Sequence, residues 1–253
     1  MIKPDLLEIN PQFTPKQKEC LKYLLDDSTK EVLFGGAAGG GKSWVGCSYL
    51  ITMCLQYPKT RYLMGRSKLD ALKKTTLNTF FEVCTAWNLK AIKDYTFNGS
   101  SNVITFYNGS EIILKDLFLY PSDRNFDSLI PKLLMTCNPA KNWVYSEYYR
   151  PAQDNTIKHY RKFIQSLVID NNYISKHYET QLSQLDELSK QRLLFGNWEY
   201  DATADSLIDY NSIMGMFSQK GITGEKYISC DVARFGSDKT VIMLWEGLHL
   251  KYI

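Results

Sequence analysis

The sequence has little of what marks several large classes of protein. Its six cysteines form no Cys-x-x-Cys pair and have no histidine at ligand spacing, which argues against a zinc site and against a disulfide scaffold. The longest uncharged apolar run, residues 44–57, is shorter than the ~20 residues that cross a bilayer. The N-terminus carries Asp5 and Glu8 and has no apolar segment of a secretory signal. We therefore expect no membrane span, reduced cysteines and a cytoplasmic setting.

A strong excess of charge is lacking as well. The 30 basic and 27 acidic residues leave a net charge of +3, which does not indicate a polyanionic partner by itself, because nucleic-acid binding depends on local clusters. Two small basic clusters exist, Lys73-Lys74 and residues 158–162, and each alone is typical of a solvated helix or strand face. Hydrophobic residues make up 44% and charged residues 23%, close to the averages of soluble globular proteins. The composition therefore predicts a folded chain with a buried core.

The N-terminal part predicts a helix followed by a strand, a loop, a helix and a second strand. The helix covers residues 14–27, with Thr14 as a candidate N-cap and a proline at the first helical position. Apolar runs at 32–34 and 61–66 predict buried strands, and residues 42–57 predict a buried helix between them. This order is typical of a parallel sheet.

The rest of the pattern predicts a long helix, a hairpin, a third buried strand, two more helical stretches and two C-terminal strands. In that order they cover residues 68–87, 102–117, 132–139, 142–149, 175–195 and 227–245. The hairpin has the strongest short-range signal, because Asn108-Gly109 stands between two runs of alternating polarity. A Gly-Ser-Asp sequence predicts the turn between the two C-terminal strands.

A run of seven residues without a side chain beyond Cβ stands inside "EVLFGGAAGGGKSW", between the first predicted strand and the next helix. It matches the phosphate-binding pattern Gly-x-x-x-x-Gly-Lys-Ser in the structural context that this pattern requires. The matching residues are Gly36, Ala37, Ala38, Gly39, Gly40, Gly41, Lys42 and Ser43. Their amides would surround a phosphate at the start of a helix, with Lys42 on the β- and γ-phosphates and Ser43 on Mg²⁺. The sequence thus predicts ATP and Mg²⁺ as cofactors; a glycine-rich turn that binds nothing is the alternative.

The acidic residues that ATP hydrolysis requires are not evident. A carboxylate should order the Mg²⁺ shell and another should activate water, usually at the end of an apolar strand that finishes in Asp-Glu. The nearest candidate is Asp116, which ends a predicted hairpin strand, follows Lys115 and precedes no glutamate. The residues therefore predict nucleotide binding more firmly than hydrolysis.

Several motifs together suggest a family. In chain order they are "FTPKQ", "GGAAGGGKS", "SEIILKDL", "LLMTCNP", "LLFGNW" and "YISCDVARFGSDKT". In this combination the chain resembles the large terminase subunit of tailed bacteriophages, the ATP-driven motor that packages DNA into a capsid. The resemblance covers nearly the whole chain and implies an α/β fold: a P-loop NTPase, with a mainly parallel sheet flanked by helices, followed by the first hairpin of an RNase H-like domain. The implied boundaries are a P-loop ATPase domain at 1–198, a linker at 199–224 and a nuclease fragment at 225–253.

The resemblance also implies roles for single residues. Gln17 matches a glutamine that reads adenine, although it also stands three residues after Thr14, where a capping box would place it. Thr136 and Asn138 match a catalytic coupling motif that senses the γ-phosphate; a strand that ends in an Asn-Pro turn is the alternative. Asp231 matches the first metal-binding aspartate of the nuclease, and the alternative is an aspartate that caps a turn.

Two departures from the family pattern bear on activity. The family would place a strand with the Asp-Glu pair, known as Walker B, between Leu129 and Ile130, and the sequence has neither the strand nor the helix after it. The sequence also stops at Ile253, before the later acidic residues of the nuclease. We therefore expect ATP binding with impaired hydrolysis and impaired DNA cleavage.

The functional hypothesis is an internally shortened and C-terminally truncated large terminase subunit, whose family drives double-stranded DNA into the capsid. The resemblance implies as partners double-stranded DNA, the small terminase subunit, the portal protein and further copies of the chain in a ring, with no membrane. It also implies the cytoplasm of an infected bacterial host. The alternative hypothesis is a nucleotide-binding remnant without catalytic activity.

Overall fold

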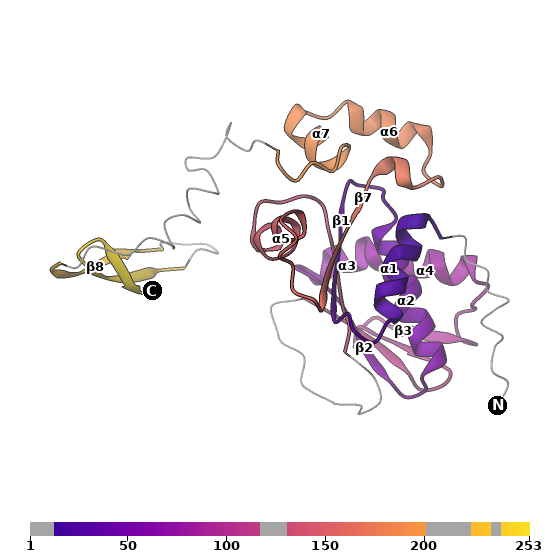
Figure 1. The fold of residues 1–253 in the computed structure, drawn as a ribbon. Coiled ribbons are helices and arrows are strands. Elements are labelled where there is room, and N and C mark those ends of the chain that lie inside the picture. The colour runs from indigo at the N-terminus through magenta and orange to yellow at the C-terminus, as the bar shows by residue number, and fades with distance from the viewer. Residues whose placement is uncertain (1–12, 117–130, 201–223, 234–238) are drawn as a thin grey trace. The chain divides into compact units, whose positions relative to one another are not determined.

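The computed structural model describes residues 13–116, 131–200, 224–233 and 239–253 (Figure 1). The chain divides into two compact units, Met1–Tyr200 and Asp201–Ile253. In the described part, no helix combines the length and the apolar character that crossing a membrane would require.

The first unit contains both helices and strands. In chain order its elements are α1 (Pro15–Leu25), β1 (Glu31–Gly36), α2 (Lys42–Gln56), β2 (Arg61–Arg66), α3 (Leu69–Lys74), α4 (Thr76–Ala86), β3 (Tyr95–Asn98), β4 (Val103–Phe106), β5 (Glu111–Asp116), β6 (Leu133–Cys137), the π-helix η1 (Tyr145–Tyr149), α5 (Arg150–Gln153), β7 (Arg161–Ser166), the 3-10 helix η2 (Val168–Asp170), α6 (Lys176–Ser183) and α7 (Glu187–Leu193). The first helix, the first two strands and the helix between them confirm the prediction from the N-terminal pattern.

The described strands of this unit form two sheets. One is parallel with the order β6-β1-β7, so β1 is its middle strand. The other has the order β2-β5-β4-β3, in which β2 and β5 are parallel and the remaining pairs are antiparallel. The predicted hairpin at Asn108-Gly109 is confirmed as β4 and β5. Each of the two strands around α2 has a parallel neighbour, but β1 and β2 belong to different described sheets, and the sheet of β2 is mixed.

Helix α2 explains the long uncharged run in the sequence, because it is buried on two sides. Four of its residues join a core with α4 and the sheet of β2: Cys47, Ile51, Cys54 and Leu55. Three others join a core with α1, β1 and β7: Val45, Tyr49 and Met53. At 100° per residue these two sets fall on opposite sides of the helix.

Successive residues of β1 face opposite sides of the parallel sheet, as in any strand. Val32 and Phe34 face the core beneath α1 and α2. Gly35 faces the indole of Trp198, which would lie only 2.5 Å from a Cβ at this position. Trp198 is stacked on Tyr149 with ring centroids 5.2 Å apart, so the parallel sheet is flanked on both faces.

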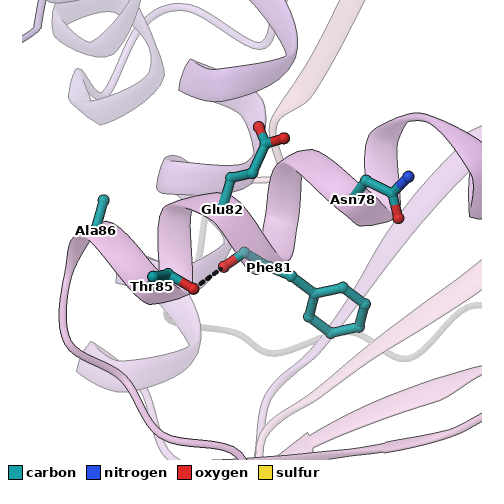
Figure 2. Close-up of a pocket in the computed structure, with 5 residues that line it drawn as sticks. All are labelled: Asn78, Phe81, Glu82, Thr85 and Ala86. Atoms are coloured by element: carbon teal, nitrogen blue, oxygen red, sulfur yellow. Dashed lines mark hydrogen bonds between the residues drawn. The ribbon is translucent and has the colours of Figure 1, made fainter.

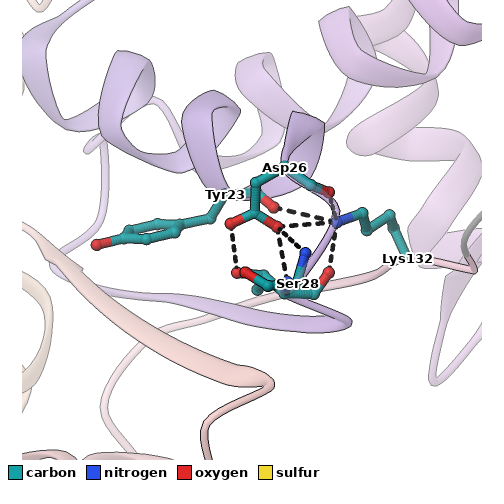
Figure 3. Close-up of polar contacts among 5 residues, drawn as sticks. Tyr23, Asp26, Ser28 and Lys132 are labelled. Atoms are coloured by element: carbon teal, nitrogen blue, oxygen red, sulfur yellow. Dashed lines mark hydrogen bonds and ion pairs between the residues drawn. The ribbon is translucent and has the colours of Figure 1, made fainter.

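The C-terminal end of α1 is held by one buried lysine (Figure 3). The ammonium of Lys132 donates to the carbonyl oxygens of Tyr23, Asp26 and Thr29, and it lies 3.3 Å from Asp26 Oδ1. A helix end leaves carbonyls without partners, and a cation is favoured there. Burial raises the pKa of Asp26, but hydrogen bonds from Thr29 and the hydrogen bond and charge of Lys132 outweigh it and lower this pKa to about 2.

Some predicted elements differ from the observed ones. The helix predicted at 68–87 is broken at Thr75, whose hydroxyl donates to Ala71 O at 2.6 Å and whose backbone leaves the helical region. Such side-chain bonds compete with the helix ladder. The stretch at 175–195 likewise forms two helices, α6 and α7. Strands β3 and β7 were not predicted at all.

The second unit is a small antiparallel sheet with the order β10-β9-β8. Its strands are β8 (Lys226–Asp231), β9 (Val241–Glu246) and β10 (His249–Tyr252). The pairing of β8 with β9 confirms the predicted pair of strands, while β10 was not predicted. Part of the predicted turn between β8 and β9, and the point between Leu129 and Ile130, lie outside the described residues.

Candidate functional site

The glycine-rich loop leaves the carboxyl end of the middle strand of the parallel sheet. The register sets Phe34 beside Thr136 on β6 and Gly36 beside Ser166 on β7, so the ends of all three strands meet at one edge. In open α/β sheets this edge is where ligands bind. The loop then enters α2 at Lys42.

Three of the loop glycines, Gly36, Gly39 and Gly41, have a positive φ that other residues rarely adopt. Gly36 has a φ of +128°, and a Cβ there would lie 2.1 Å from the carbonyl oxygen of Ser166. Gly41 has a φ of +71° and is the N-cap of α2. A side chain at either position would be strained, and at Gly36 it would also collide with the end of β7. This is part of the reason why the loop lacks side chains.

The start of α2 presents amides that the helix itself does not use. Its N-cap Gly41 supplies no side-chain hydrogen bond, and the first amides of a helix have no partner within it. Those amides, together with the positive end of the helix dipole, favour an anion. Ser43 is in the first turn and is exposed, so its hydroxyl is accessible at the same place.

Lys42 is folded back over the loop and is only 9% exposed. Its ammonium donates to the carbonyl oxygens of Gly36, at 3.3 Å, and of Ala37. Burial lowers the pKa of Lys42 to about 8, against a smaller opposing effect of Cys137 at the end of β6. The lysine is therefore mainly charged at neutral pH and lies against the loop.

The first two amides inside the loop are already used by the protein. Ala37 N donates to Ser166 O at 2.9 Å, and Ala38 N donates to Leu193 O at 2.8 Å. These bonds fix the beginning of the loop to β7 and to the end of α7. The amides that remain for a bound anion therefore begin at Gly39.

Gln17 is buried against the loop, at 3% exposure. The capping box with Thr14 is present: Thr14 N donates to Gln17 Oε1 at 2.9 Å, and Gln17 N donates to Thr14 Oγ1 at 3.3 Å. The side chain also donates from Nε2 to Gly41 O at 2.9 Å. Of the two interpretations of Gln17, the capping box is confirmed, and adenine reading stays a prediction.

Two residues at the site had not been predicted. Ser166 Oγ donates to Gly40 O at 2.8 Å, and Asn171 Nδ2 donates to Gly39 O at 2.6 Å. Both belong to β7 and the segment after it, which the sequence pattern did not identify as a strand.

The two residues matched to a coupling motif are at the same edge of the sheet. Thr136 is exposed, and Asn138 follows Cys137, which pairs with Gly35. The register thus sets the end of β6 beside the beginning of the loop. Their sensing role stays a prediction.

Asp231 lies apart from this site in the chain, at the end of β8 in the second unit. It is exposed and paired in register with Val241. Among the described residues, no group of three or more His, Cys, Asp or Glu side chains is placed to hold a metal ion. Metal binding by Asp231 stays a prediction.

A separate hollow lies on α4 and shares no residue with the loop (Figure 2). Its lining residues all come from one face of the helix: Asn78, Phe81, Glu82, Thr85 and Ala86. They include an acidic side chain and no basic one, so this hollow does not suit a phosphate.

Comparison with known proteins gives a likeness of structure. No protein-family model and no curated protein matches the chain. The large terminase from a thermophilic bacteriophage, in complex with ATP-gamma-S, matches with a TM-score of 0.55 and 17% identity, covering 93% of this chain and 64% of that one. The same terminase in complex with ADP matches with a TM-score of 0.56 and 17% identity, covering 92% and 65%.

At this identity the likeness establishes the fold: an α/β protein whose parallel sheet is flanked by helices, as in these terminase structures. The chain spans a little under two thirds of the length of the structures that it matches. The same fold holds the glycine-rich loop of this chain between β1 and α2.

Proposed function

We propose that this chain is a large terminase subunit whose loop at 36–43 binds ATP together with Mg²⁺. The observation that carries the proposal is the loop itself: it joins the middle strand of a parallel sheet to a helix whose first amides are uncapped, in a fold shared with a terminase that binds ATP-gamma-S and ADP. The ordered motifs of the sequence support the same family.

The residues of the loop fit this ligand. The amides from Gly39 onward and the start of α2 suit the phosphates, and Lys42 would exchange its loop carbonyls for phosphate oxygens. Mg²⁺ supplies charge neutralisation between the phosphates when it is bound, and the exposed hydroxyl of Ser43 would be its protein ligand. Thr136 and Asn138 would sense the γ-phosphate from the end of β6.

The activity that we propose for the intact family member is translocation of double-stranded DNA into a capsid. Its partners would be the small terminase subunit, the portal protein and further copies of the chain in a ring. Such a motor holds the DNA backbone without reading its sequence. Asp231 would be a metal ligand of the RNase H-like nuclease.

We further propose that hydrolysis is impaired. Among the described strands, β6 and β2 each lie at an edge of their own sheet, and both contact α2. The strand with the Asp-Glu pair that the family resemblance implies would be a further member of the parallel sheet, and the sequence lacks it. Without a positioned base, the rate should be lower by roughly 10² to 10⁴. The same observation favours the alternative function, a nucleotide-binding remnant without catalytic activity.

The first test is ATP binding, measured by calorimetry with Lys42→Ala as the variant and Lys93→Ala as the control. Lys93 is exposed and outside the loop. Loss of a charged hydrogen-bond donor should weaken binding by about 10- to 100-fold, whereas Lys93→Ala should bind as the parent does. Absence of binding at millimolar ATP, or equal affinity in Lys42→Ala, would contradict the proposal.

The second test separates the motor from the remnant. Phosphate release from ATP is measured with and without double-stranded DNA, in the parent and in Lys42→Ala. DNA-stimulated release that Lys42→Ala abolishes would rule out the remnant. Binding without any release above the Lys42→Ala background would rule out hydrolysis by this chain.

A further inference from the structure

Three consecutive carbonyl groups of the loop are each held by a different side chain. Gly39 O accepts from Asn171, Gly40 O accepts from Ser166, and Gly41 O accepts from Gln17. Gly41 O also accepts from Val45 N in the first turn of α2, at 3.2 Å. The donors come from two distant parts of the chain, one in α1 and two at or after the end of β7. We name Gln17, Ser166 and Asn171 the carbonyl clasp.

The clasp determines where the next amides point. A trans peptide unit is planar, and its C=O and N–H groups point in opposite directions. The carbonyl of Gly39 shares a peptide unit with the amide of Gly40, and the same holds for Gly40 with Gly41 and for Gly41 with Lys42. Because the three carbonyls are turned toward the clasp, the amides of Gly40, Gly41 and Lys42 are turned away from it.

The members of the clasp are themselves held in place. Gln17 Oε1 accepts from Thr14 N in the capping box, and Asn171 Oδ1 accepts from Tyr173 N at 3.1 Å. Ser166 is fully buried at the end of β7. Each donor therefore approaches its carbonyl from a side chain whose orientation the fold has already fixed.

The clasp also explains glycines that the phosphate alone would not require. A Cβ on Gly40 would lie 2.4 Å from Ser166 Oγ, and a Cβ on Gly41 would lie 2.4 Å from Gln17 Nε2. The bare loop thus leaves room for the clasp on one side while its amides face the other.

We propose that the carbonyl clasp preorganises the loop, so that Ser166 and Asn171 are positioning residues for nucleotide binding and Gln17 acts through the loop carbonyl. This inference rests on the proposed function for its ligand, the triphosphate. Since the clasp orders amides that face phosphate, its loss should weaken binding of any triphosphate, whatever the base.

The test measures affinity for ATP, GTP and inorganic tripolyphosphate by calorimetry. The neutral variants Ser166→Ala and Asn171→Leu should each lower the affinity for all three ligands by about 3- to 10-fold, which corresponds to the loss of one hydrogen bond. Asn78→Leu is the matched control, since Asn78 also donates from Nδ2 to a backbone carbonyl but on the exposed face of α4, and it should change none of them.

Gln17→Glu separates the clasp from base reading. Glutamate keeps the acceptor that the capping box uses but has no donor for Gly41 O. If Gln17 acts through the clasp, the affinities for ATP and for GTP should fall by the same factor. A selective loss of ATP affinity, with GTP unchanged, would remove Gln17 from the clasp and assign it to the base.

A second readout does not depend on a ligand. In nucleotide-free protein labelled with ¹⁵N-glycine, the amide signal of Gly40 should shift or broaden in Asn171→Leu, and that of Gly41 in Ser166→Ala, because each amide shares its peptide unit with the released carbonyl. Unchanged signals and unchanged affinities would overturn the clasp. If the parent protein bound no triphosphate but these signals moved, the clasp would stand and the proposed function would fail.

Discussion

The two strands that pair with β1, β7 and β6, differ in how far their residues are buried. On β7 no residue is exposed, and its last residue, Ser166, bonds both to Ala37 N and to Gly40 O. On β6 both Leu133 and Thr136 are exposed, although this strand has the more apolar sequence. A parallel strand normally has both faces covered. The β7 side of β1, which holds the loop, is therefore covered, whereas the β6 side leaves two side chains exposed.

The largest effect should come from removing the packing behind β1 on the β7 side. Trp198 is 1% exposed and lies against Gly35, Phe163 and Tyr149. Trp198→Ala should lower the free energy of unfolding by about 3–5 kcal/mol, measured by chemical denaturation. Trp143→Ala is the control, because Trp143 is 57% exposed; a similar loss in both variants would show that the packing is not specific to this side.

The next effect concerns Lys132, the residue before β6, whose ammonium bonds to the end of α1. Lys132→Met removes the ammonium that serves the carbonyls at the end of α1, and should cost about 1.5–3 kcal/mol of unfolding free energy. Lys16→Met, in an exposed pair with Glu19, should change stability by less than about 1 kcal/mol. Equal melting temperatures for the two variants would show that the Lys132 bonds do not persist in solution.

The same cluster predicts an acid dependence. The folded-state pKa of Asp26 is lowered to about 2 from an ordinary value near 3.8, so its contribution to stability is present above the ordinary pKa and is lost as the pH falls through about 2. Denaturation curves from pH 5 to pH 2 should therefore fall less steeply in Asp26→Asn than in the parent. Parallel curves would contradict the lowered pKa.

A smaller effect should appear in the pH dependence of ATP binding. Only the protonated form of Lys42 attracts a triphosphate, and its pKa is about 8 in the nucleotide-free protein. Affinity should therefore fall as the pH rises above 8, by up to about tenfold per unit, whereas Lys42→Arg should give a flat profile because arginine stays charged. A falling profile in both proteins would assign the titration to another group.

The smallest effect is expected on the exposed face of β6. Leu133→Thr should change the free energy of unfolding by no more than about 0.5 kcal/mol, as at other exposed positions. The same substitution at Leu33, which is fully buried on β1, should cost about 2 kcal/mol or more. Comparable costs at the two positions would mean that β6 is covered in solution, and the contrast between the two sides would not hold.

The sequence was sufficient where the signals are local. The loop at 36–43, the strand before it and the helix after it follow from short-range residue types, and so does the capping box at Thr14. Strand β7 has the sequence "RKFIQS", in which charged and polar residues interrupt the apolar ones, and the pattern gave no reason to place it beside β1. Ser166 and Asn171 were therefore missed, because their bonds join residues more than 120 positions apart.

The arrangement of the strands was also beyond the sequence pattern. A strand, a helix and a strand predict parallel pairing, but they do not say whether a further strand intervenes between the two. The antiparallel hairpin at Asn108-Gly109 was evident from its turn, whereas the parallel pairing of β5 with β2 depends on contacts that no local signal encodes.

Helix α2 has buried residues on two opposite sides, so rolling or tilting it would open one core or the other. The C-terminal end of α2 is fixed as well, because Asn108 Nδ2 donates to Cys54 O and Leu55 O. Packing on both sides and these bonds at its end make α2 one rigid connection between the glycine-rich loop and the turn at Asn108.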